Sequence, residues 1–239
     1  MKKVKRFFLA GLLLVGATAA WAQDEIETTI SGDVVSSYIW RGQDLGDVSL
    51  QPTLGVSYKG LSLTAWGSVG LTDPLDTKEF DLTLSYTTGG LNIGITDYWF
   101  NAGLDPDARY FKYDAHGTNH VFEANIGYDF GVASVQWFTN FAGNDGINKD
   151  GKRAYSSYAE VVVPFKLSAI DWTATVGAVP YATSFYNDWT SGFAVTNVSL
   201  KATKEIKVTD SFSIPVFAQV VGNPCTQKAY LVFGFTLQP

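Results

Sequence analysis

Residues 229–237 read Ala-Tyr-Leu-Val-Phe-Gly-Phe-Thr-Leu, and this stretch decides the fold class. Apolar side chains occupy every second position, namely Ala229, Leu231, Phe233, Phe235 and Leu237. The positions between them form a second face that is more polar. Because successive side chains of a β-strand point to opposite faces of a sheet, this period of two predicts a strand with one apolar face.

The same alternation recurs along the whole chain. We predict twelve strands, with the ranges 28–40, 49–58, 61–70, 79–88, 91–100, 120–130, 132–141, 154–165, 170–180, 193–204, 211–221 and 228–237. Each has about the 9–11 residues that a tilted membrane-spanning strand requires. After the first 22 residues, no run of about 18 apolar residues follows, which excludes a helical membrane protein.

The connections between the predicted strands alternate in length. Short turns such as 59–60 and 88–90 are followed by longer polar loops at 41–48, 71–78, 101–119, 142–153, 181–192 and 222–227. This asymmetry is typical of outer-membrane barrels, whose short turns face the periplasm. In lipid, an open sheet edge would leave backbone groups unsatisfied, so we expect closure. The sequence therefore predicts an all-β fold, a single closed antiparallel transmembrane barrel. A soluble barrel or sandwich is the alternative.

Aromatic residues lie near the ends of several predicted strands. They include Tyr38, Trp40, Tyr58, Tyr86, Trp99, Trp137, Phe141 and Trp172. On a membrane barrel we expect these residues to form the two interfacial girdles. In a soluble protein the same residues would fill a core.

Residues 1–22 have the pattern of a secretory signal peptide. Four positive charges within residues 2–6 precede the apolar run 7–20, and Ala20-Trp21-Ala22 provides a small-residue cleavage site. The run is shorter than the roughly 20 residues of a membrane-spanning helix, although a retained anchor is the alternative. We expect residues 23–239 to form a barrel in the cell outer membrane, in contact with outer-membrane lipid.

Charge and cysteine content exclude other classes of protein. The formal net charge is -6, and loss of the four positive charges in residues 1–22 makes it -10. Nucleic-acid-binding surfaces are basic, so no nucleic-acid partner is expected. The single cysteine, Cys225, cannot form an internal disulfide.

Four short motifs in the first part of the chain resemble a known family. They read Ser37-Tyr38-Ile39-Trp40-Arg41-Gly42, Gln51-Pro52, Trp66-Gly67-Ser68 and Glu79-Phe80-Asp81-Leu82. This pattern resembles the Gcw_chp family of uncharacterised bacterial envelope proteins, over about the first quarter of the chain. The resemblance implies an outer-membrane barrel and carries over no catalytic residue. The chain departs from many such barrels by ending on Gln238-Pro239 and not on an aromatic residue.

If the apolar faces meet lipid, the opposite faces place charged side chains in the lumen. The candidates are Asp33, Asp81, Glu123, Asp129, Glu160, Asp171 and Lys201. An excess of carboxylates in a pore favours small cations over anions. The alternative is a filled interior, in which these carboxylates pair with Lys201, Arg41 and tyrosine hydroxyls. Asp97 falls on the apolar face of its strand, so we expect it near the rim, beside a bulge or in a shifted register.

Arg41 lies where the first predicted strand reaches its loop, which places it at the rim. A guanidinium there would bind an anionic headgroup or a carboxylate in a bidentate manner. The alternative is a rim ion pair with Asp44 or Asp47.

Two loops carry residues of the kinds that bind metals. Both histidines, His116 and His120, follow Asp114, but no helix aligns them, and a solvated loop is the other interpretation. Residues 144–151 resemble a calcium loop, yet Ser157 stands where the bidentate glutamate belongs. We expect no metal and no cofactor.

Three hypotheses about function follow. The first is a porin-like channel for small solutes with a weakly cation-favouring lumen. The second is a closed structural or ligand-binding barrel that acts through the loops 101–119 and 142–153. The third is an outer-membrane lipid-modifying enzyme that uses His116 or His120. Because the sequence contains no readable Ser/His/Asp arrangement and no nucleophile elbow, we do not expect an enzyme.

Overall fold

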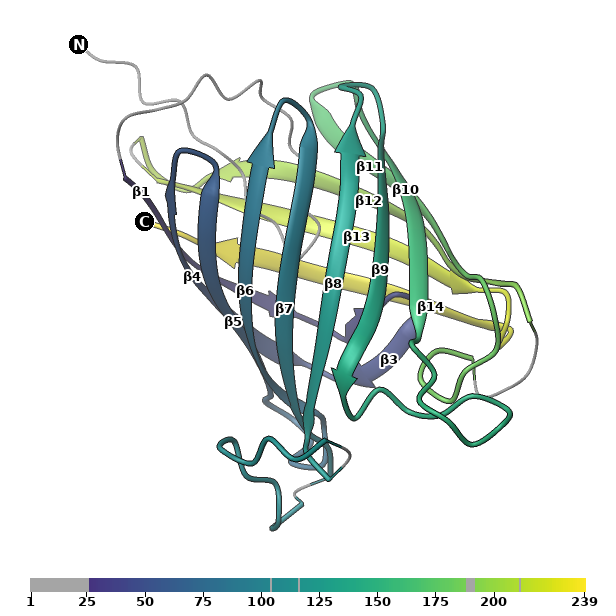
Figure 1. Cartoon of the computed structure of the whole chain (residues 1–239). Helices are drawn as coiled ribbons and strands as arrows, with labels where there is room; N and C mark the ends of the chain where they lie inside the picture. The colour runs from purple at the N-terminus through teal and green to yellow at the C-terminus, as the bar shows by residue number, and fades with distance from the viewer. Residues whose placement is uncertain (1–25, 104, 116, 188–191, 211) are drawn as a thin grey trace.

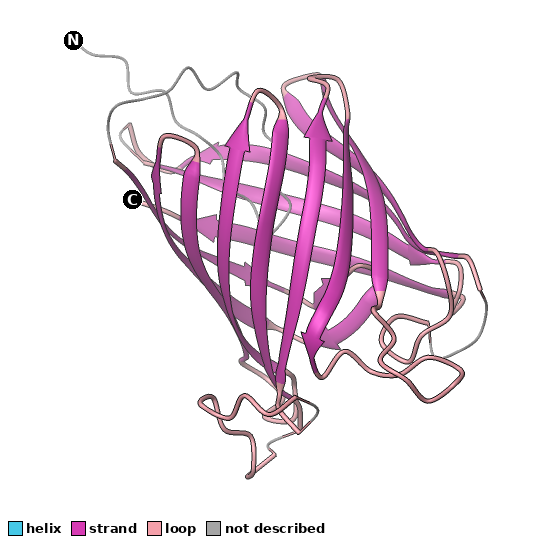
Figure 2. Ribbon diagram, in the orientation of Figure 1, coloured by secondary structure: helices cyan, strands magenta, loops and turns pink. Residues whose placement is uncertain are grey.

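The computed structural model describes residues 26–103, 105–115, 117–187, 192–210 and 212–239. The predicted signal peptide lies outside these residues. The described part of the chain consists of strands, turns and loops, as Figure 2 shows. Within the same residues, no helix is long and apolar enough to cross a membrane.

Twelve antiparallel strands close into one barrel in the order β1-β14-β13-β12-β11-β10-β9-β8-β7-β6-β5-β4 (Figure 1). Their bounds are β1 Glu27–Val35, β4 Ser49–Tyr58, β5 Leu61–Gly70, β6 Lys78–Thr88, β7 Leu91–Asn101, β8 His120–Asp129, β9 Ser134–Gly143, β10 Ser157–Leu167, β11 Ile170–Val179, β12 Ala194–Lys207, β13 Ser213–Asn223 and β14 Lys228–Leu237. Two further strands, β2 (Tyr38–Trp40) and β3 (Gln43–Gly46), form a separate two-stranded sheet. The prediction of a closed all-β barrel is confirmed.

The barrel closes where the first and last strands meet. β1 pairs with β4 on one side and with β14 on the other, with Val34 opposite Leu50 and Phe235. The N–H and C=O groups of the wall strands therefore have neighbours all round the barrel, which is the condition for a sheet placed in lipid.

Short turns and long loops lie at opposite ends of the barrel, as predicted. The turn at Lys59 and Gly60 has φ angles of 49° and 85°, and that at Gly89 and Gly90 has 55° and 88°. Positive φ at both central positions is the geometry of the tight two-residue hairpin turn. The last strand also ends at this short-turn end (Figure 1).

The two faces of the wall differ in chemistry. On β14, Leu231 and Phe233 point outward and are 56% and 53% exposed, whereas Val232 and Thr236 point inward and are buried. The same contrast recurs around the barrel, with large apolar side chains outside and most of the buried polar side chains inside. A soluble protein has the reverse arrangement, so the barrel fits an outer-membrane protein.

The first predicted strand is wrong at its C-terminal end. We expected residues 28–40 to form one strand, but β1 ends at Val35, and β2 pairs with β3 in a hairpin. The other eleven strands match their predicted bounds to within three residues. After Ser36, whose N–H donates to the Phe233 carbonyl at 2.8 Å, the chain leaves the wall and turns inward. Tyr38 and Trp40 therefore do not belong to an interfacial girdle.

Candidate functional site in the lumen

A hairpin formed by β2 and β3 crosses the lumen from the wall at β1 and β4. Its two-residue turn is Arg41-Gly42, with φ angles of 50° and 81°. The Gly42 carbonyl accepts a hydrogen bond from Asn223 Nδ2 at 3.0 Å. A Cβ atom at Gly42 would lie 1.8 Å from the carbonyl oxygen of Thr196, so only glycine fits there. The tip of the hairpin thus touches β12 and β13 as well as the wall opposite its base.

Arg41 forms a buried ion pair with Glu123 of β8. Arg41 Nη1 donates to Glu123 Oε2 at 2.5 Å, and Nη2 donates to Oε1 at 2.9 Å. The two side chains are 5% and 3% exposed. A parallel pair of charge-assisted bonds fixes both the position and the orientation of the guanidinium. The prediction that Arg41 lies at the rim and pairs with Asp44 or Asp47 is therefore wrong.

Two tyrosines complete the hydrogen bonding of Glu123. The Tyr98 hydroxyl on β7 donates to Oε1 at 2.8 Å. The Tyr186 hydroxyl, from the loop between β11 and β12, accepts from Arg41 and donates to Oε2 at 3.4 Å. Burial raises the pKa of Tyr186 well above its usual value, so the hydroxyl keeps its proton and remains a donor. A buried charge needs partners of this kind.

Aromatic rings surround the guanidinium. Arg41 Cζ lies 4.4 Å from the ring centroid of Trp40, 4.1 Å from that of Phe138 on β9 and 4.7 Å from that of Tyr158 on β10. A cation over an aromatic face within about 6 Å is attracted by the ring quadrupole, most strongly where water is excluded. The rings therefore stabilise the same position of the hairpin as Glu123 does.

Further carboxylates lie in the lumen near this arginine. The Tyr38 hydroxyl donates to Glu79 Oε2 at 2.8 Å, and the Tyr158 hydroxyl donates to Glu160 Oε2 at 3.1 Å. Asp81 is 1% exposed and lies beside Glu79, and no N–H or hydroxyl group of the described residues donates to its oxygens. We name Arg41, Glu79, Asp81, Glu123 and Glu160, with the aromatic side chains around them, the lumen cluster.

Four other predicted lumen residues lie away from the lumen cluster, namely Asp33, Asp129, Asp171 and Lys201. Asp33 accepts a hydrogen bond from Thr236 Oγ1 at 2.6 Å, and the Lys201 ammonium lies 3.8 Å from the Phe217 ring centroid. Asp129 accepts from the Gly131 N–H at 2.6 Å and so stabilises a short turn.

Asp171 does not lie in the buried interior. Its side chain is 62% exposed and pairs with Lys166 at 3.2 Å beside the β10–β11 turn. The reason is its place in the strand, since β11 begins at Ile170 and Asp171 therefore lies at the short-turn end of the barrel.

Sequence reasoning missed Glu79 and the rings of Tyr98, Phe138, Tyr158 and Tyr186. Glu79 was detectable, because it precedes Asp81 by two positions and so shares its inward face. The Arg41-Gly42 pair also carried a signal, since glycine at the second position of a two-residue turn indicates a hairpin. Nothing in the sequence indicates that this hairpin points inward.

The histidine loop offers no arrangement for catalysis in the described residues. His120 is buried, with Nδ1 2.7 Å from Asp97 Oδ1 and Nε2 2.5 Å from the Tyr110 carbonyl oxygen. Both ring nitrogens are thus engaged, and neither is free to act as a base for a nucleophile. His116 lies outside the described residues. Asp97 is the seventh of the 11 residues of β7 and pairs with Phe122, beside the register shift at Phe122 and Glu123 of β8, which fits the expected place beside a bulge.

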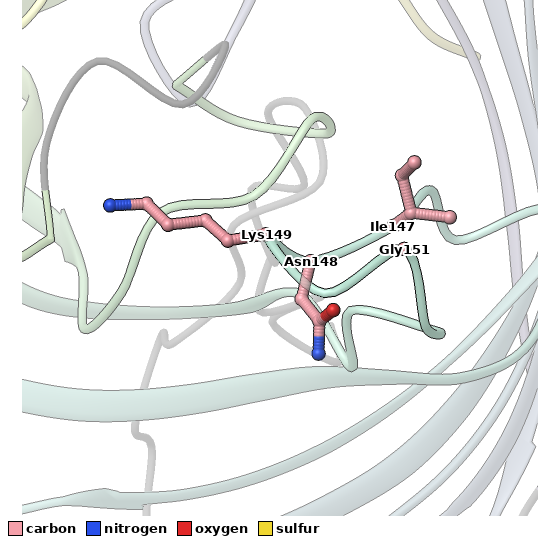
Figure 3. A pocket seen from close by; sticks show the side chains of 4 residues that line it. All are labelled: Ile147, Asn148, Lys149 and Gly151. Atoms are coloured by element: carbon pink, nitrogen blue, oxygen red, sulfur yellow. The ribbon is translucent and has the colours of Figure 1, made fainter.

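The loop that resembles a calcium site is a compact turn. Asn148 Oδ1 accepts hydrogen bonds from the N–H groups of Asp150 and Lys152 at 2.9 and 3.1 Å. A pocket of about 350 Å³ beside it is lined by Ile147, Asn148, Lys149 and Gly151 (Figure 3). The charged side chain in that lining is a lysine, which is unsuited to a cation. In the described residues, no group of three or more acidic, histidine or cysteine side chains is placed to hold a metal.

Comparison with known proteins adds no relative: no family model matches the chain, and no curated protein is significantly similar to it. The resemblance to the Gcw_chp family stays a prediction.

Proposed function

We propose that the protein is an outer-membrane channel for small solutes, and that the β2–β3 hairpin is its gate. The ion pair between Arg41 and Glu123 carries this proposal, because it ties the hairpin tip to a strand on the far side of the lumen. Because the hairpin forms a sheet separate from the wall, its release requires only the loss of the contacts at its tip and of the hydrogen bond from the Thr77 N–H to the Leu45 carbonyl. In the proposed open state the hairpin has left the lumen.

The charge of the lumen cluster supports a preference for cations. Arg41 neutralises Glu123, which leaves Glu79, Asp81 and Glu160 as an excess of acidic side chains in the same region. At the long-loop end, a pocket of about 320 Å³ is lined in part by Asp44, Asp47 and Asp76. Carboxylates that are ionised at the long-loop end, and in the lumen once water enters it, raise the local concentration of cations and lower that of anions.

A second candidate is a closed barrel that acts through its loops. The rings packed around Arg41 favour it, because a filled lumen is a stable end state and needs no gate. The two candidates differ in a single respect, namely whether the hairpin leaves the lumen.

Planar-bilayer recording of the purified protein tests the proposal. We expect the wild-type channel to be shut most of the time and the Arg41→Ala variant to open much more often, with a reversal potential that indicates cations. Arg153→Ala is the matched control, because Arg153 donates to the carbonyls of Gly143, at the end of β9, and Ala115, in the β7–β8 loop, and does not contact Glu123. If the folded Arg41→Ala barrel stays silent at all voltages, the closed barrel is the better account.

A further inference from the structure

Asp97 lies on the outer face of the barrel wall. Along β7, Ile93 and Ile95 point outward and are 42% and 49% exposed, and Asp97 continues their row. Its partners on the adjacent strands β6 and β8 are Leu82 and Phe122, which also point outward. A carboxylate in a lipid-facing row is costly unless it is paired and covered.

His120 pairs with this carboxylate and is itself covered. The His120 ring is buried, and its Nδ1 lies 2.7 Å from Asp97 Oδ1. Its Nε2 lies 2.5 Å from the Tyr110 carbonyl oxygen, which can only accept a hydrogen bond, so Nε2 donates. The pair thus ties the backbone of the loop between β7 and β8 to the outer wall.

The side chain of Tyr110 packs against the same wall. Its ring centroid lies 5.6 Å from that of Phe80 and 5.8 Å from that of Trp99, which belong to outward-facing rows of β6 and β7. Tyr113 stacks on His120 with 4.2 Å between ring centroids. The loop therefore folds back over the outside of the barrel, whereas the β2–β3 hairpin folds into the lumen.

The covering loop exposes an apolar surface beside the wall. Phe111 is 88% exposed, and its ring lies 5.1 Å from that of Tyr110, to which it is perpendicular. Phe80 and Trp99, which contact Tyr110, are each two residues along their strands from the outward-facing pair Leu82 and Asp97. Two strand residues span about 7 Å, so the loop packs about 7 Å from Leu82. The exposed ring is thus continuous with the apolar band of the barrel.

We propose that residues 105–115 form a lipid-binding loop, whose aromatic side chains Phe111 and Tyr113 insert into the leaflet at the long-loop end of the barrel. The partner is a lipid surface, at the boundary between headgroups and acyl chains, where aromatic side chains are enriched. This inference rests on the membrane location in the proposed function and is independent of whether the lumen conducts.

Nitroxide labels in liposome-inserted barrels test the loop. Single labels are placed by Phe111→Cys, by Leu84→Cys on the outer wall, and by Ile147→Cys in the loop between β9 and β10, each in a Cys225→Ala background. Leu84 and Ile147 are 51% and 48% exposed, so the three sites are all accessible to the labelling reagent. Collision rates with oxygen, which partitions into lipid, and with a water-soluble nickel chelate are then compared.

We expect oxygen to dominate at positions 111 and 84, and the nickel chelate to dominate at position 147. A label at 111 that behaves like that at 147, while 84 remains in lipid, overturns the inference and indicates a loop that faces an extracellular partner. A label at 84 that is also in water overturns the membrane location itself. The two failures are therefore distinguishable.

Discussion

Arg41 and Glu123 are separated by 82 positions in the chain and are joined by two hydrogen bonds inside the barrel. The arginine is at the tip of a hairpin that belongs to no wall sheet, and the glutamate belongs to the wall. The pair therefore holds the β2–β3 hairpin in place across the lumen. A hairpin that moves makes the protein a gated channel, and a hairpin that stays in place makes it a closed barrel.

The ion pair should contribute to stability chiefly because each charge would be costly alone. Arg41→Ala leaves Glu123 buried without its cation, and we expect a loss of about 3–5 kcal/mol in the free energy of unfolding. The double variant Arg41→Met/Glu123→Leu removes both charges and should recover most of that loss. Urea-induced unfolding of the barrel in liposomes measures both. A double variant as unstable as Arg41→Ala would show that the loss arises from packing and not from charge.

Selectivity should depend on Asp81, which is buried beside Glu79 while the hairpin fills the lumen and which becomes a hydrated carboxylate once the hairpin has left. A carboxylate about 5 Å from a passing ion in water contributes about 0.8 kcal/mol, or about a fourfold preference. In an Arg41→Ala background that opens the channel, Asp81→Asn should lower the cation-to-anion permeability ratio by up to that factor, as measured from reversal potentials in a salt gradient. Asp210→Asn is the control, since Asp210 is fully exposed beside Lys207 at the short-turn end. Equal effects of the two substitutions would contradict a lumen role for Asp81.

Gly177 should be intolerant of any side chain, because a Cβ there would lie 1.8 Å from the Tyr158 hydroxyl. The Tyr158 ring packs against the Arg41 guanidinium, so displacement of this ring weakens the contacts that hold the hairpin tip. We expect Gly177→Ala to cost roughly 1–3 kcal/mol, as overpacking does, and to increase channel opening. Gly222→Ala is the matched control on another strand, where the nearest atom to the Cβ lies 3.7 Å away. Similar urea midpoints for the two variants would refute the packing argument.

The wall of the barrel was predictable from sequence because its signal is local. Each outward-facing row repeats apolar residues at every second position, so alternation alone locates strands such as β14, whose predicted and observed bounds agree. The alternation of turn and loop lengths then fixes which end is which. Both signals are independent of the contacts between distant strands.

The hairpin was not predictable for the opposite reason. Tyr38, Ile39 and Trp40 continue the apolar and aromatic character of the first strand, so the break at Ser36 is invisible in the pattern. The contact with Glu123 exists because barrel closure brings β8 opposite β1, and closure is a property of all twelve strands together. From the sequence alone, Arg41 fits a position at the rim equally well, because the closure of the barrel is not visible in the sequence.

Removal of the hairpin tests the account most directly. Val35 and Ser49 are paired across β1 and β4, so an Asn-Gly turn in place of residues 36–48 joins the two strands in a tight hairpin. Single-channel recording then compares this variant with the wild type, after heat-dependent gel mobility has shown that both barrels are folded. We predict a persistently open, cation-preferring channel in the variant and a mostly shut one in the wild type. A folded variant that stays silent would contradict the claim that the hairpin is what closes the lumen.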